Sequence, residues 1–235
     1  MANIINEIRD RTRMFRRRMS DPKKYVKTSE TSGQLQLELL RKEGCSPASR
    51  VLEIGCGCLH LGIPLVEYLE PGHYAGIDPN EWLRSKAMKN RQIRDLMTQK
   101  QARFLSNEDF DGSSLNTQFD YIFAHSVLSH AAHWQLEQFL KNSLAVLAPA
   151  GKILASIRLA EGNEFGSTGS ENGEDSHATE WQYPGISWFK LSTVIEMAGN
   201  LGLDTRHVPE YTGFYTRTCP NEYHDWIVFS SRQEK

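Results

Sequence analysis

The residues best suited to chemistry lie in the stretch 51–62, where an apolar strand ends on an acid and runs into a glycine turn. Glu53, Gly55 and Gly57 have the spacing E-x-G-x-G, and His60 stands where the dinucleotide fingerprint G-x-G-x-x-G has its third glycine. A dinucleotide turn presents backbone amides to a pyrophosphate, whereas an acid before the first glycine repels phosphate and attracts a cation. The stretch therefore predicts a nucleotide-like cofactor with an amino group, such as S-adenosylmethionine, and argues against NAD.

A second set of reactive side chains follows the strongly apolar stretch 119–124. Within nine residues it comprises His125, Ser126, Ser129, His130 and His133. Open α/β sheets place their substrates at the carboxyl ends of the strands, so these side chains are expected beside a substrate. Histidine is the natural base near neutral pH, and the spacing of His130 and His133 could put both on one face of a helical turn. The alternative for each histidine is that it caps or packs a helix.

The elements that must position these residues alternate between strands and helices. Strands are expected at 50–54, 74–77, 102–105, 119–124, 152–157, 204–208 and 225–230, and helices at 32–44, 61–69, 82–100, 135–147 and 191–201. This alternation indicates a mostly parallel sheet with helices on both faces. The last two strands predict a hairpin-like close to that sheet.

Two segments depart from the alternation. Residues 1–33 form an Arg-rich head whose apolar residues fall on one side of a helix, which predicts a basic amphipathic helix and a linker. The head could cover the core or form a homodimer contact, or it could clamp an acidic acceptor, nucleic acid or an anionic membrane; a solvated face is the commoner use of such a charge run. Residues 161–181 are polar, glycine-rich and acidic, and are too long for an ordinary connection.

Composition limits the class of protein. A length of 235 residues, a hydrophobic fraction of 39% and a net charge of -2 suit one globular α/β domain with a full core, and argue against a dedicated nucleic-acid binder. No apolar run approaches the roughly 18 to 20 residues that cross a bilayer. The four cysteines form neither a disulfide framework nor a paired zinc site. Cys56 and Cys58 are interpreted as small residues in a tight turn, and the protein is expected to be cytoplasmic.

The motifs resemble, in order and spacing, the class I S-adenosylmethionine-dependent methyltransferases. The matching segments are LQLELL at 35–40, RVLEIGCG at 50–57, YLEPGHYAGIDPNEWL at 68–83, FDYIFAHSVLSHA at 119–131 and HDWIVF at 224–229. The chain is most similar to a branch of small bacterial enzymes often associated with glycan or specialised-metabolite pathways. The resemblance implies a Rossmann-like seven-stranded sheet with an antiparallel strand near the C-terminus. It places the methyltransferase domain at 34–235, with an acceptor lid at about 161–190.

The resemblance also implies which residues bind the cofactor. Gly55, Cys56 and Gly57 would wrap its methionine part, Glu53 would face its ammonium group, and Asp78 would accept both ribose hydroxyls. The other expected cofactor contacts are Pro79, Trp82, Asp109, Phe110 and His125. Trp82 could equally anchor its own helix, and the polar loop that holds Asp109 is also what an ordinary turn contains.

The acceptor site is expected at the histidines and at the polar lid. The candidate catalytic residues are His130 and His133, and the expected acceptor contacts are Ser129, Tyr183, Trp188, Tyr211 and Tyr215. Aromatic rings with polar tips suit a sugar or another ring-bearing small molecule, although sheet-edge packing would account for about half of such residues. No cluster of His, Asp and Glu suggests a catalytic magnesium ion, so no metal is expected.

These expectations predict an enzyme that transfers a methyl group from S-adenosylmethionine to a hydroxyl, or less readily an amine, of a small molecule or saccharide. In-line displacement makes alignment a large part of the rate, and a hydroxyl acceptor also needs its proton removed. One alternative keeps the family but acts on nucleic acid or protein through the basic head. Another is an inactive cofactor-binding scaffold, suggested by Leu59 in place of a glycine common in the family motif.

Overall fold

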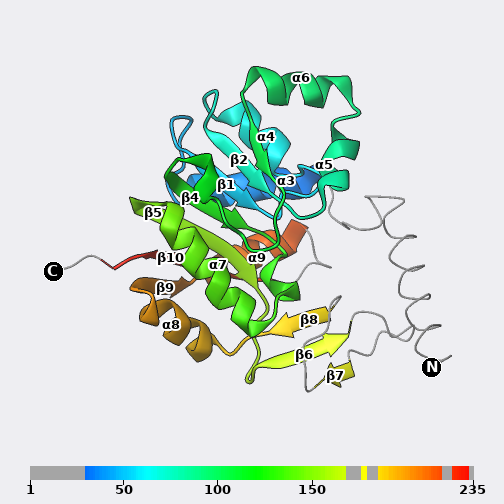
Figure 1. Ribbon diagram of the computed structural model, residues 1–235. Coiled ribbons are helices and arrows are strands. Elements are labelled where there is room, and N and C mark those ends of the chain that lie inside the picture. The colour runs from blue at the N-terminus through cyan, green and yellow to red at the C-terminus, as the bar shows by residue number, and fades with distance from the viewer. Residues whose placement is uncertain (1–29, 168–175, 179–184, 219–223, 233–235) are drawn as a thin grey trace.

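The computed structural model describes residues 30–167, 176–178, 185–218 and 224–232, and its centre is a seven-stranded sheet (Figure 1). The strand order is β3-β2-β1-β4-β5-β10-β9. The strands are β1 (Val51–Ile54), β2 (Tyr74–Ile77), β3 (Arg103–Leu105), β4 (Phe119–Ala124), β5 (Leu147–Ile157), β9 (Leu203–His207) and β10 (Asp225–Ser231). The predicted sheet is confirmed, including its antiparallel strand near the C-terminus.

The pairing of the strands fixes where a ligand site can form. β1 pairs in parallel with β2 on one side and with β4 on the other, so the chain reverses its direction of winding between β1 and β4. β10 runs antiparallel between β5 and β9, with Asp225 opposite Ile157. The start of β10 therefore lies at the same edge of the sheet as the carboxyl ends of β1, β4 and β5. Ligands of open α/β sheets bind at this edge, near the point of reversal.

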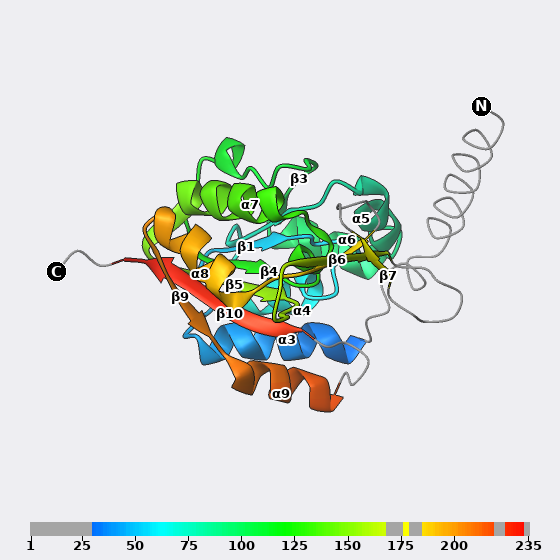
Figure 2. The same cartoon turned by 90° about the horizontal axis from the view of Figure 1, so that it is seen from below.

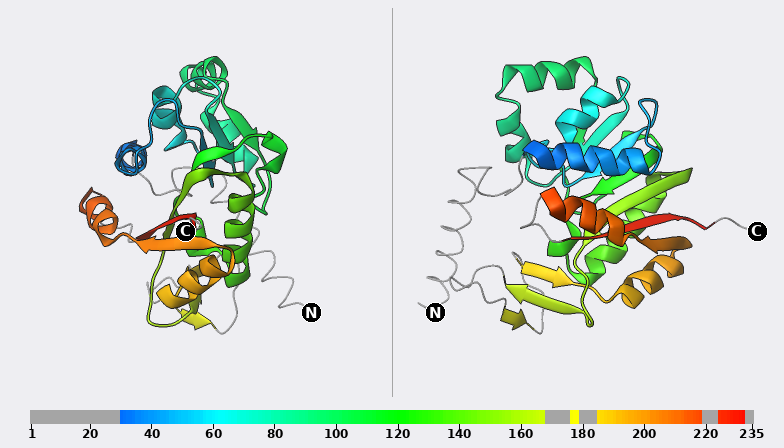
Figure 3. Two further views of the ribbon diagram at one scale, coloured as in Figure 1. Left: turned by 90° about the vertical axis from the view of Figure 1, so that its left-hand side faces the viewer. Right: turned by 180° about the vertical axis from the view of Figure 1, so that it is seen from behind.

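Helices cover both faces of the sheet (Figures 2 and 3). On one face lie α3 (Glu30–Lys42), α4 (Gly62–Tyr68) and α9 (Pro209–Thr218), with α6 (Arg91–Gln99) packed on α4. On the other face lie α7 (His133–Val146) and α8 (Leu191–Asn200). Short connections are α5 (Glu81–Ala87), η1 (Ser113–Leu115) and η2 (Leu128–His130).

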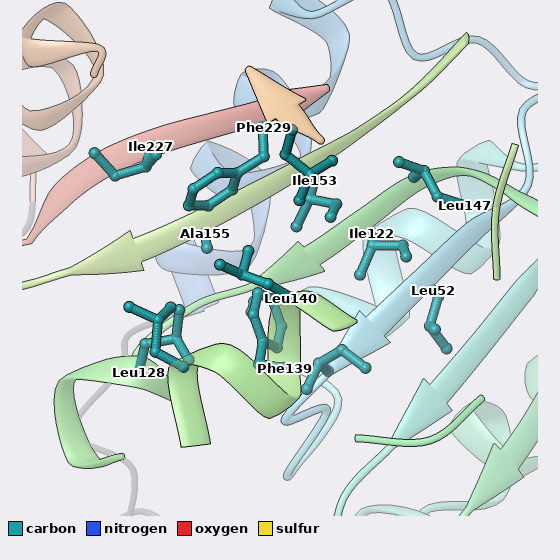
Figure 4. Packing of buried hydrophobic residues seen from close by; sticks show 14 of the residues in the cluster. Leu52, Ile122, Leu128, Phe139, Leu140, Leu147, Ile153, Ala155, Ile227 and Phe229 are labelled. Atoms are coloured by element: carbon teal, nitrogen blue, oxygen red, sulfur yellow. The ribbon is translucent and has the colours of Figure 1, made fainter. Parts of the chain in front are cut away.

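The alternation of side chains along β1 divides the core into two layers. Leu52 and Ile54 join the apolar layer under α7 and α8, which Figure 4 shows with Phe139 and Leu140 facing the strands. Val51 joins the second layer, under α3 and α4. Glu53 follows the same alternation and points into this second layer, where a carboxylate is unusual.

A buried carboxylate fastens α3 and α9 to the sheet. Glu43, just after α3, is 8% exposed. Its Oε1 accepts hydrogen bonds of 2.6 Å from Arg206 of β9 and from the Tyr211 hydroxyl of α9, and its Oε2 is 2.9 Å from Nζ of Lys152 on β5. The Tyr121 hydroxyl donates to the Glu43 carbonyl oxygen. Four elements thus meet at one side chain.

Two predicted element boundaries were wrong. The helix expected at 82–100 is two helices, because α5 ends at Ala87 and Asn90 caps α6 by accepting a 2.9 Å bond from the Gln92 amide. β5 begins at Leu147, although Pro149 and Gly151 look like a helix stop. The segment 209–218, to which the sequence analysis assigned no element, is the helix α9.

The polar segment after β5 also contains regular structure. It forms a small antiparallel sheet of order β7-β6-β8, from β6 (Glu164–Ser167), β7 (Ser176–Ala178) and β8 (Gly185–Trp188). β8 packs against η2, directly after the fourth central strand. The expected lid is therefore a sheet over part of its length. Most of the basic head, residues 1–29, lies outside the described residues, and no helix of the described part is long and apolar enough to span a membrane.

Candidate active site

The turn after β1 favours glycine at two positions, Gly55 and Gly57, because both have a left-handed backbone. Gly55 has φ +78°, and a Cβ at this position would lie 2.3 Å from Cγ2 of Val127, in the loop after β4. Gly57 has φ +44°. Leu59, where the family motif has a glycine, also takes a left-handed φ of +64° and is fully buried. The turn therefore keeps its shape at Leu59, at a backbone cost of about 1 kcal/mol.

Asp78 lies at the carboxyl end of β2 and faces this turn. Its Oδ2 accepts a 2.9 Å hydrogen bond from the Gly57 amide, and its Oδ1 accepts a 2.7 Å bond from the Asn80 amide. The side chain is buried and held at both oxygens. Each carboxylate oxygen can accept a further bond, so the group can still receive two hydroxyl donors. Pro79, which follows, is exposed.

Glu53 lies behind the turn and is paired with a neutral partner. Its Oε2 accepts a 2.6 Å hydrogen bond from the Tyr74 hydroxyl, and no Lys, Arg or His of the described residues forms an ion pair with it. Burial, with a smaller contribution from the charge of Asp78, raises the pKa of Glu53 to about 8, against the lowering effect of the Tyr74 bond. A cation bound at the turn would stabilise the ionised form of Glu53 and so lower its pKa.

The cysteines of the turn fill space. Cys56 is buried, and a Cβ at Gly76 on β2 would lie 2.9 Å from its Sγ. Burial raises the pKa of Cys56 well above its ordinary value, and burial together with the charge of Asp78 raises that of Cys58 to about 11. Both thiols are free and protonated at neutral pH. The geometry agrees with the small-residue interpretation of this pair.

The loop after β3 differs from what the sequence suggested. Asp109 is exposed, and its Oδ1 receives the Asp111 amide within the loop. The Phe110 ring packs edge-to-face on Phe139 of α7 at 5.7 Å. Asn107, which the sequence analysis did not select, is half-buried, and its Oδ1 is a buried acceptor with no partner among the described residues. Asn107 is therefore a better candidate than Asp109 to receive an adenine amino group.

Trp82 and His125 lie at opposite sides of the turn. Trp82, near the start of α5, is half-buried, which suits either a cofactor contact or an anchor for that helix. His125 directly follows β4 and stacks on Trp226 at 5.6 Å. Its Nδ1 is 3.2 Å from Nε2 of Gln36 on α3. Because an amide N–H can only donate, this contact leaves Nδ1 unprotonated and puts the ring proton on Nε2.

The environment keeps His125 neutral. Burial, and then the nearby His60, lower the pKa of His125 to about 3. His224, immediately before β10, packs edge-on against His125 at 5.0 Å. His130 lies close enough to His224 to disfavour its charged form. We call His125, His130 and His224 the edge histidines.

The two predicted catalytic histidines lie in different elements. His130 ends η2, whereas His133 begins α7 and packs its ring on Phe189 at 4.8 Å. The expected shared helical face does not form, because Ala131, between them, is extended. His133 also bonds to the backbone of Trp188, which makes it a connection between α7 and β8. This geometry favours a packing role for His133, and its assignment as a base stays a prediction.

The expected acceptor contacts have separate environments. Ser129 in η2 is 1% exposed, and its hydroxyl has no partner among the described residues. The Trp188 ring lies 5.9 Å from the Arg158 guanidinium, in the part of β8 that packs near η2. The Tyr211 hydroxyl donates to Glu43 at 2.6 Å, and its contact with the acceptor stays a prediction. Tyr183 and the side chain of Tyr215 lie outside the described residues.

The loops at the carboxyl edge share one backbone property. Leu59, Phe110 and Ser126 have positive φ although none is glycine, and they follow β1, β3 and β4 in turn. Ser126, with φ +57°, donates its amide to Oγ of Ser156 at 2.8 Å. Strained residues of this kind gather at functional sites, where surrounding contacts hold them in place. Gln101 and Asn116, which precede β3 and β4, also have positive φ, so this property is not confined to the carboxyl edge.

Comparison with known proteins agrees with the fold. The family described as "Methyltransferase domain" matches residues 52–153, from β1 into β5. The structure of DhpI in complex with SAH is similar at 15% identity and a TM-score of 0.61, covering 94% of this chain and 95% of that one. An S-adenosylmethionine-dependent methyltransferase from Clostridium acetobutylicum is similar at 12% identity and a TM-score of 0.61, covering 88% and 93%.

A third similar structure is the magnesium protoporphyrin IX methyltransferase from Synechocystis with bound SAM. It has 14% identity and a TM-score of 0.56, and the match covers 86% of this chain and 79% of that one. The strand order, the position of the glycine turn and the matched segment agree with one another. The chain therefore has the fold of the class I methyltransferases, the family that its motifs resemble, and its residues 52–153 match the methyltransferase-domain family.

Proposed function

We propose that this protein transfers a methyl group from S-adenosylmethionine to a hydroxyl group of a small-molecule or saccharide acceptor. The observation that carries the proposal is the hydrogen-bonded contact between the glycine turn after β1 and a buried acid at the end of the neighbouring strand β2. The Gly57 amide and Asp78 Oδ2 are 2.9 Å apart, so the turn and the acid form one rigid unit. When bound, S-adenosylmethionine would supply a methyl group on a positively charged sulfur.

Three groups of this unit match parts of that cofactor. Asp78 has acceptor capacity left on both oxygens for the two ribose hydroxyls. Asn107 Oδ1 is a buried acceptor that could receive the adenine amino group. Glu53 is a buried carboxyl group whose ionised form would be stabilised by an ammonium group, directly or through water. The residues present therefore fit the cofactor better than they fit a pyrophosphate, which Glu53 and Asp78 would repel.

The acceptor is proposed to lie over β4, β5 and the start of β10. The edge histidines and Ser129 are at this edge, and β8 brings Trp188 beside it. Proteins of similar structure include a magnesium protoporphyrin IX methyltransferase and a glycopeptide N-methyltransferase, which supports a small-molecule or glycan acceptor. A hydroxyl acceptor requires a base, and neutral imidazoles supply one.

Alignment would supply most of the rate. In-line displacement needs the acceptor oxygen, the methyl carbon and the sulfur on one line. A Cβ at Gly55 would lie 2.3 Å from Cγ2 of Val127, so the loop that carries His125 and His130 packs directly on the cofactor turn. This close packing would let the chain hold the cofactor and the acceptor next to each other at one edge of the sheet.

Isothermal titration with S-adenosylmethionine and with S-adenosylhomocysteine tests the foundation of this proposal. The wild-type protein is expected to bind both, and Asp78→Ala is expected to weaken binding by roughly 100-fold, since two charge-assisted hydrogen bonds are lost. Asp95→Ala is the matched control, because Asp95 lies exposed on α6 in an ion pair with Arg91. The absence of binding to the wild-type protein, or equal binding by the Asp78 variant, would overturn the proposal.

A further inference from the structure

His224 is the first residue of the HDWIVF segment, and the sequence analysis gave it no role in the site. It directly precedes β10, whose first residue pairs with Ile157 at the carboxyl end of β5. It is therefore at the same sheet edge as the glycine turn and η2. The residue is 4% exposed.

The ring of His224 is held by its neighbours. It packs edge-on against His125 at 5.0 Å, and His125 is itself stacked on Trp226 at 5.6 Å, with an interplanar angle of 14°. Gln36 fixes His125 from α3 and also donates to Ser32 at 2.9 Å. Because both rings are confined by aromatic packing and a hydrogen bond, His224 is oriented before any ligand arrives.

The Nδ1 atom of His224 is buried and has no hydrogen-bond partner among the described residues. Buried polar atoms in native proteins almost always form a hydrogen bond, so an unpaired one suggests that a ligand supplies the missing partner. The hydroxyls of Ser129 in η2 and Ser187 in β8 are also buried without a hydrogen-bond partner among the described residues. These two elements pack together. Three unsatisfied polar groups thus collect at the proposed acceptor side of the edge.

The surroundings of His224 keep its ring in the neutral form. Burial, followed by the influence of His125, Arg158 and His130, lowers the pKa of His224 well below its ordinary value. The ring is therefore neutral throughout the physiological range. A low pKa weakens a base, but loss of the nearby sulfonium charge during methyl transfer would favour the imidazolium as it forms.

We propose that His224 is the catalytic base, accepting the proton of the acceptor hydroxyl at Nδ1. This inference rests on the proposed methyl transfer. The acceptor oxygen forms its bond to the methyl carbon while the carbon–sulfur bond breaks and leaves its electron pair on sulfur. The hydroxyl proton moves to Nδ1 of His224, and the resulting imidazolium later releases a proton to water. The products are the methyl ether and S-adenosylhomocysteine.

The other histidines are less suited to this step. The Nδ1 of His125 is occupied by Gln36, and His133 is engaged with Phe189 and the backbone of Trp188. His130 lies next to His224 and is placed to contact the acceptor or to share its proton. We therefore assign the base to His224 instead of His130, the residue predicted from the sequence.

A first experiment tests His224 without any acceptor. Long-range ¹H–¹⁵N spectra of the histidine-labelled wild-type protein at pH 7.5, assigned with His224→Asn, report which ring nitrogen carries the proton. Reception of a proton at Nδ1 requires Nδ1 to be unprotonated and Nε2 to be protonated. A protonated Nδ1 in the resting protein would overturn the assignment.

A second experiment measures turnover with methyl-labelled S-adenosylmethionine and a panel of phenols, monosaccharides and a small-molecule cell extract. His224→Asn and His224→Gln are expected to bind the cofactor within twofold of wild type but to lower kcat by about 100-fold or more, the usual contribution of a general base. His73→Gln is the control, because His73 precedes β2 at the opposite edge of the sheet.

The outcomes separate the two claims. If the wild-type protein is active and the His224 variants keep kcat within threefold of wild type, His224 is not the base and the methyl-transfer proposal stands. If the wild-type protein binds the cofactor but methylates nothing in the panel or extract, the proposed function fails, and the role of His224 fails with it. Impaired cofactor binding by both His224 variants would mark the residue as structural and would also overturn the assignment.

Discussion

Glu53 and Asp78 are two buried carboxyl groups that meet the glycine turn from neighbouring strands and differ in their partners. Asp78 accepts two backbone amides, whereas Glu53 accepts one tyrosine hydroxyl. Asp78 is therefore anchored in the protein without a ligand. Glu53 is neutral in the protein without a ligand, and a cation bound beside it would lower its pKa and favour its ionised form.

Replacement of Glu53 by Gln is expected to stabilise the protein at alkaline pH. The folded-state pKa of about 8 lies above the ordinary 4.5, so the folded protein binds more protons than the unfolded chain between these values. Stability should therefore fall as the pH rises from about 4.5 to 8, on the order of 3 kcal/mol, and Glu53→Gln should not show this loss. Urea unfolding at pH 5 and pH 8.5 measures both.

Glu67→Gln serves as the control, because Glu67 is exposed on the neighbouring α4. A pH dependence of stability that is the same in Glu53→Gln as in the wild-type protein would contradict the proposed protonation of Glu53. The same substitution should weaken binding of S-adenosylmethionine, since the carboxylate that meets its ammonium group is gone. If Glu53→Gln is more stable than the wild-type protein but binds the cofactor more weakly, then Glu53 serves ligand binding at a cost in stability.

Residue-level prediction from the sequence succeeded where spacing alone defines a conformation. The turn glycines and Asp78 follow from the strand and turn pattern. Asn107 and His224 were not selected, because nothing in a single sequence shows that a polar side chain is buried without a partner. The bond from Tyr211 to Glu43 was not foreseen either, since it spans 168 positions of the chain.

At the scale of elements, the fastening of α3 to the sheet matters most for the site. α3 supplies Gln36 to His125, and a Cβ at its Gly33 would lie 2.0 Å from the His60 carbonyl oxygen. Its C-terminal end is held by Glu43. Figure 3 shows the blue α3 and the orange-red α9 together on one side of the sheet. The position of α3 thus connects the Glu43 network to the edge histidines.

Replacement of Glu43 by Gln is expected to destabilise the protein by about 3 kcal/mol, because removal of one partner leaves buried polar groups uncompensated. Burial alone would raise the pKa of Glu43, but hydrogen bonds from Tyr211, Arg206 and Lys152 lower it. Its stabilisation is therefore present above about pH 4.5 and is lost as the pH falls through the lowered pKa. Chemical denaturation at pH 7 and at pH 3 should show a smaller difference at the lower pH.

Glu38→Gln is the comparison for this experiment, since Glu38 forms an exposed ion pair with Arg41 on the same helix. Such a pair contributes about 0 to 1 kcal/mol. Equal effects of the two substitutions would show that the Glu43 network does not hold α3.

Elements with strong local signals were predicted well, and those that depend on distant contacts were not. β1, β2 and β4 were placed correctly because each is a continuous apolar run between turn signals. The break before α6 had a local signal in Asn90, a good capping residue, which the helical pattern around it obscured. The sheet of β6 and β8 could not be predicted, because a polar, glycine-rich segment gains its strands only by pairing.

At the scale of the whole molecule, the two faces of the sheet are apolar, and the candidate site residues lie at one edge. The cofactor residues lie over β1 and β2, and the edge histidines lie over β4, β5 and β10. Leu59, Phe110 and Ser126, which have positive φ, follow the parallel strands β1, β3 and β4. The fold class and the position of the glycine turn were predictable from the order of the motifs. The proposed acceptor site was not, because it would be built by β8 and the start of β10.

Methyl transfer itself is the most direct test of the account. Purified protein with methyl-labelled S-adenosylmethionine and a small-molecule extract should form S-adenosylhomocysteine and a labelled product in equal amounts, and omission of the extract should stop both. The account predicts this stoichiometry for the wild-type protein and its loss in Asp78→Ala. Tight binding of the cofactor without its consumption, under every acceptor condition, would contradict it and would indicate a binding scaffold.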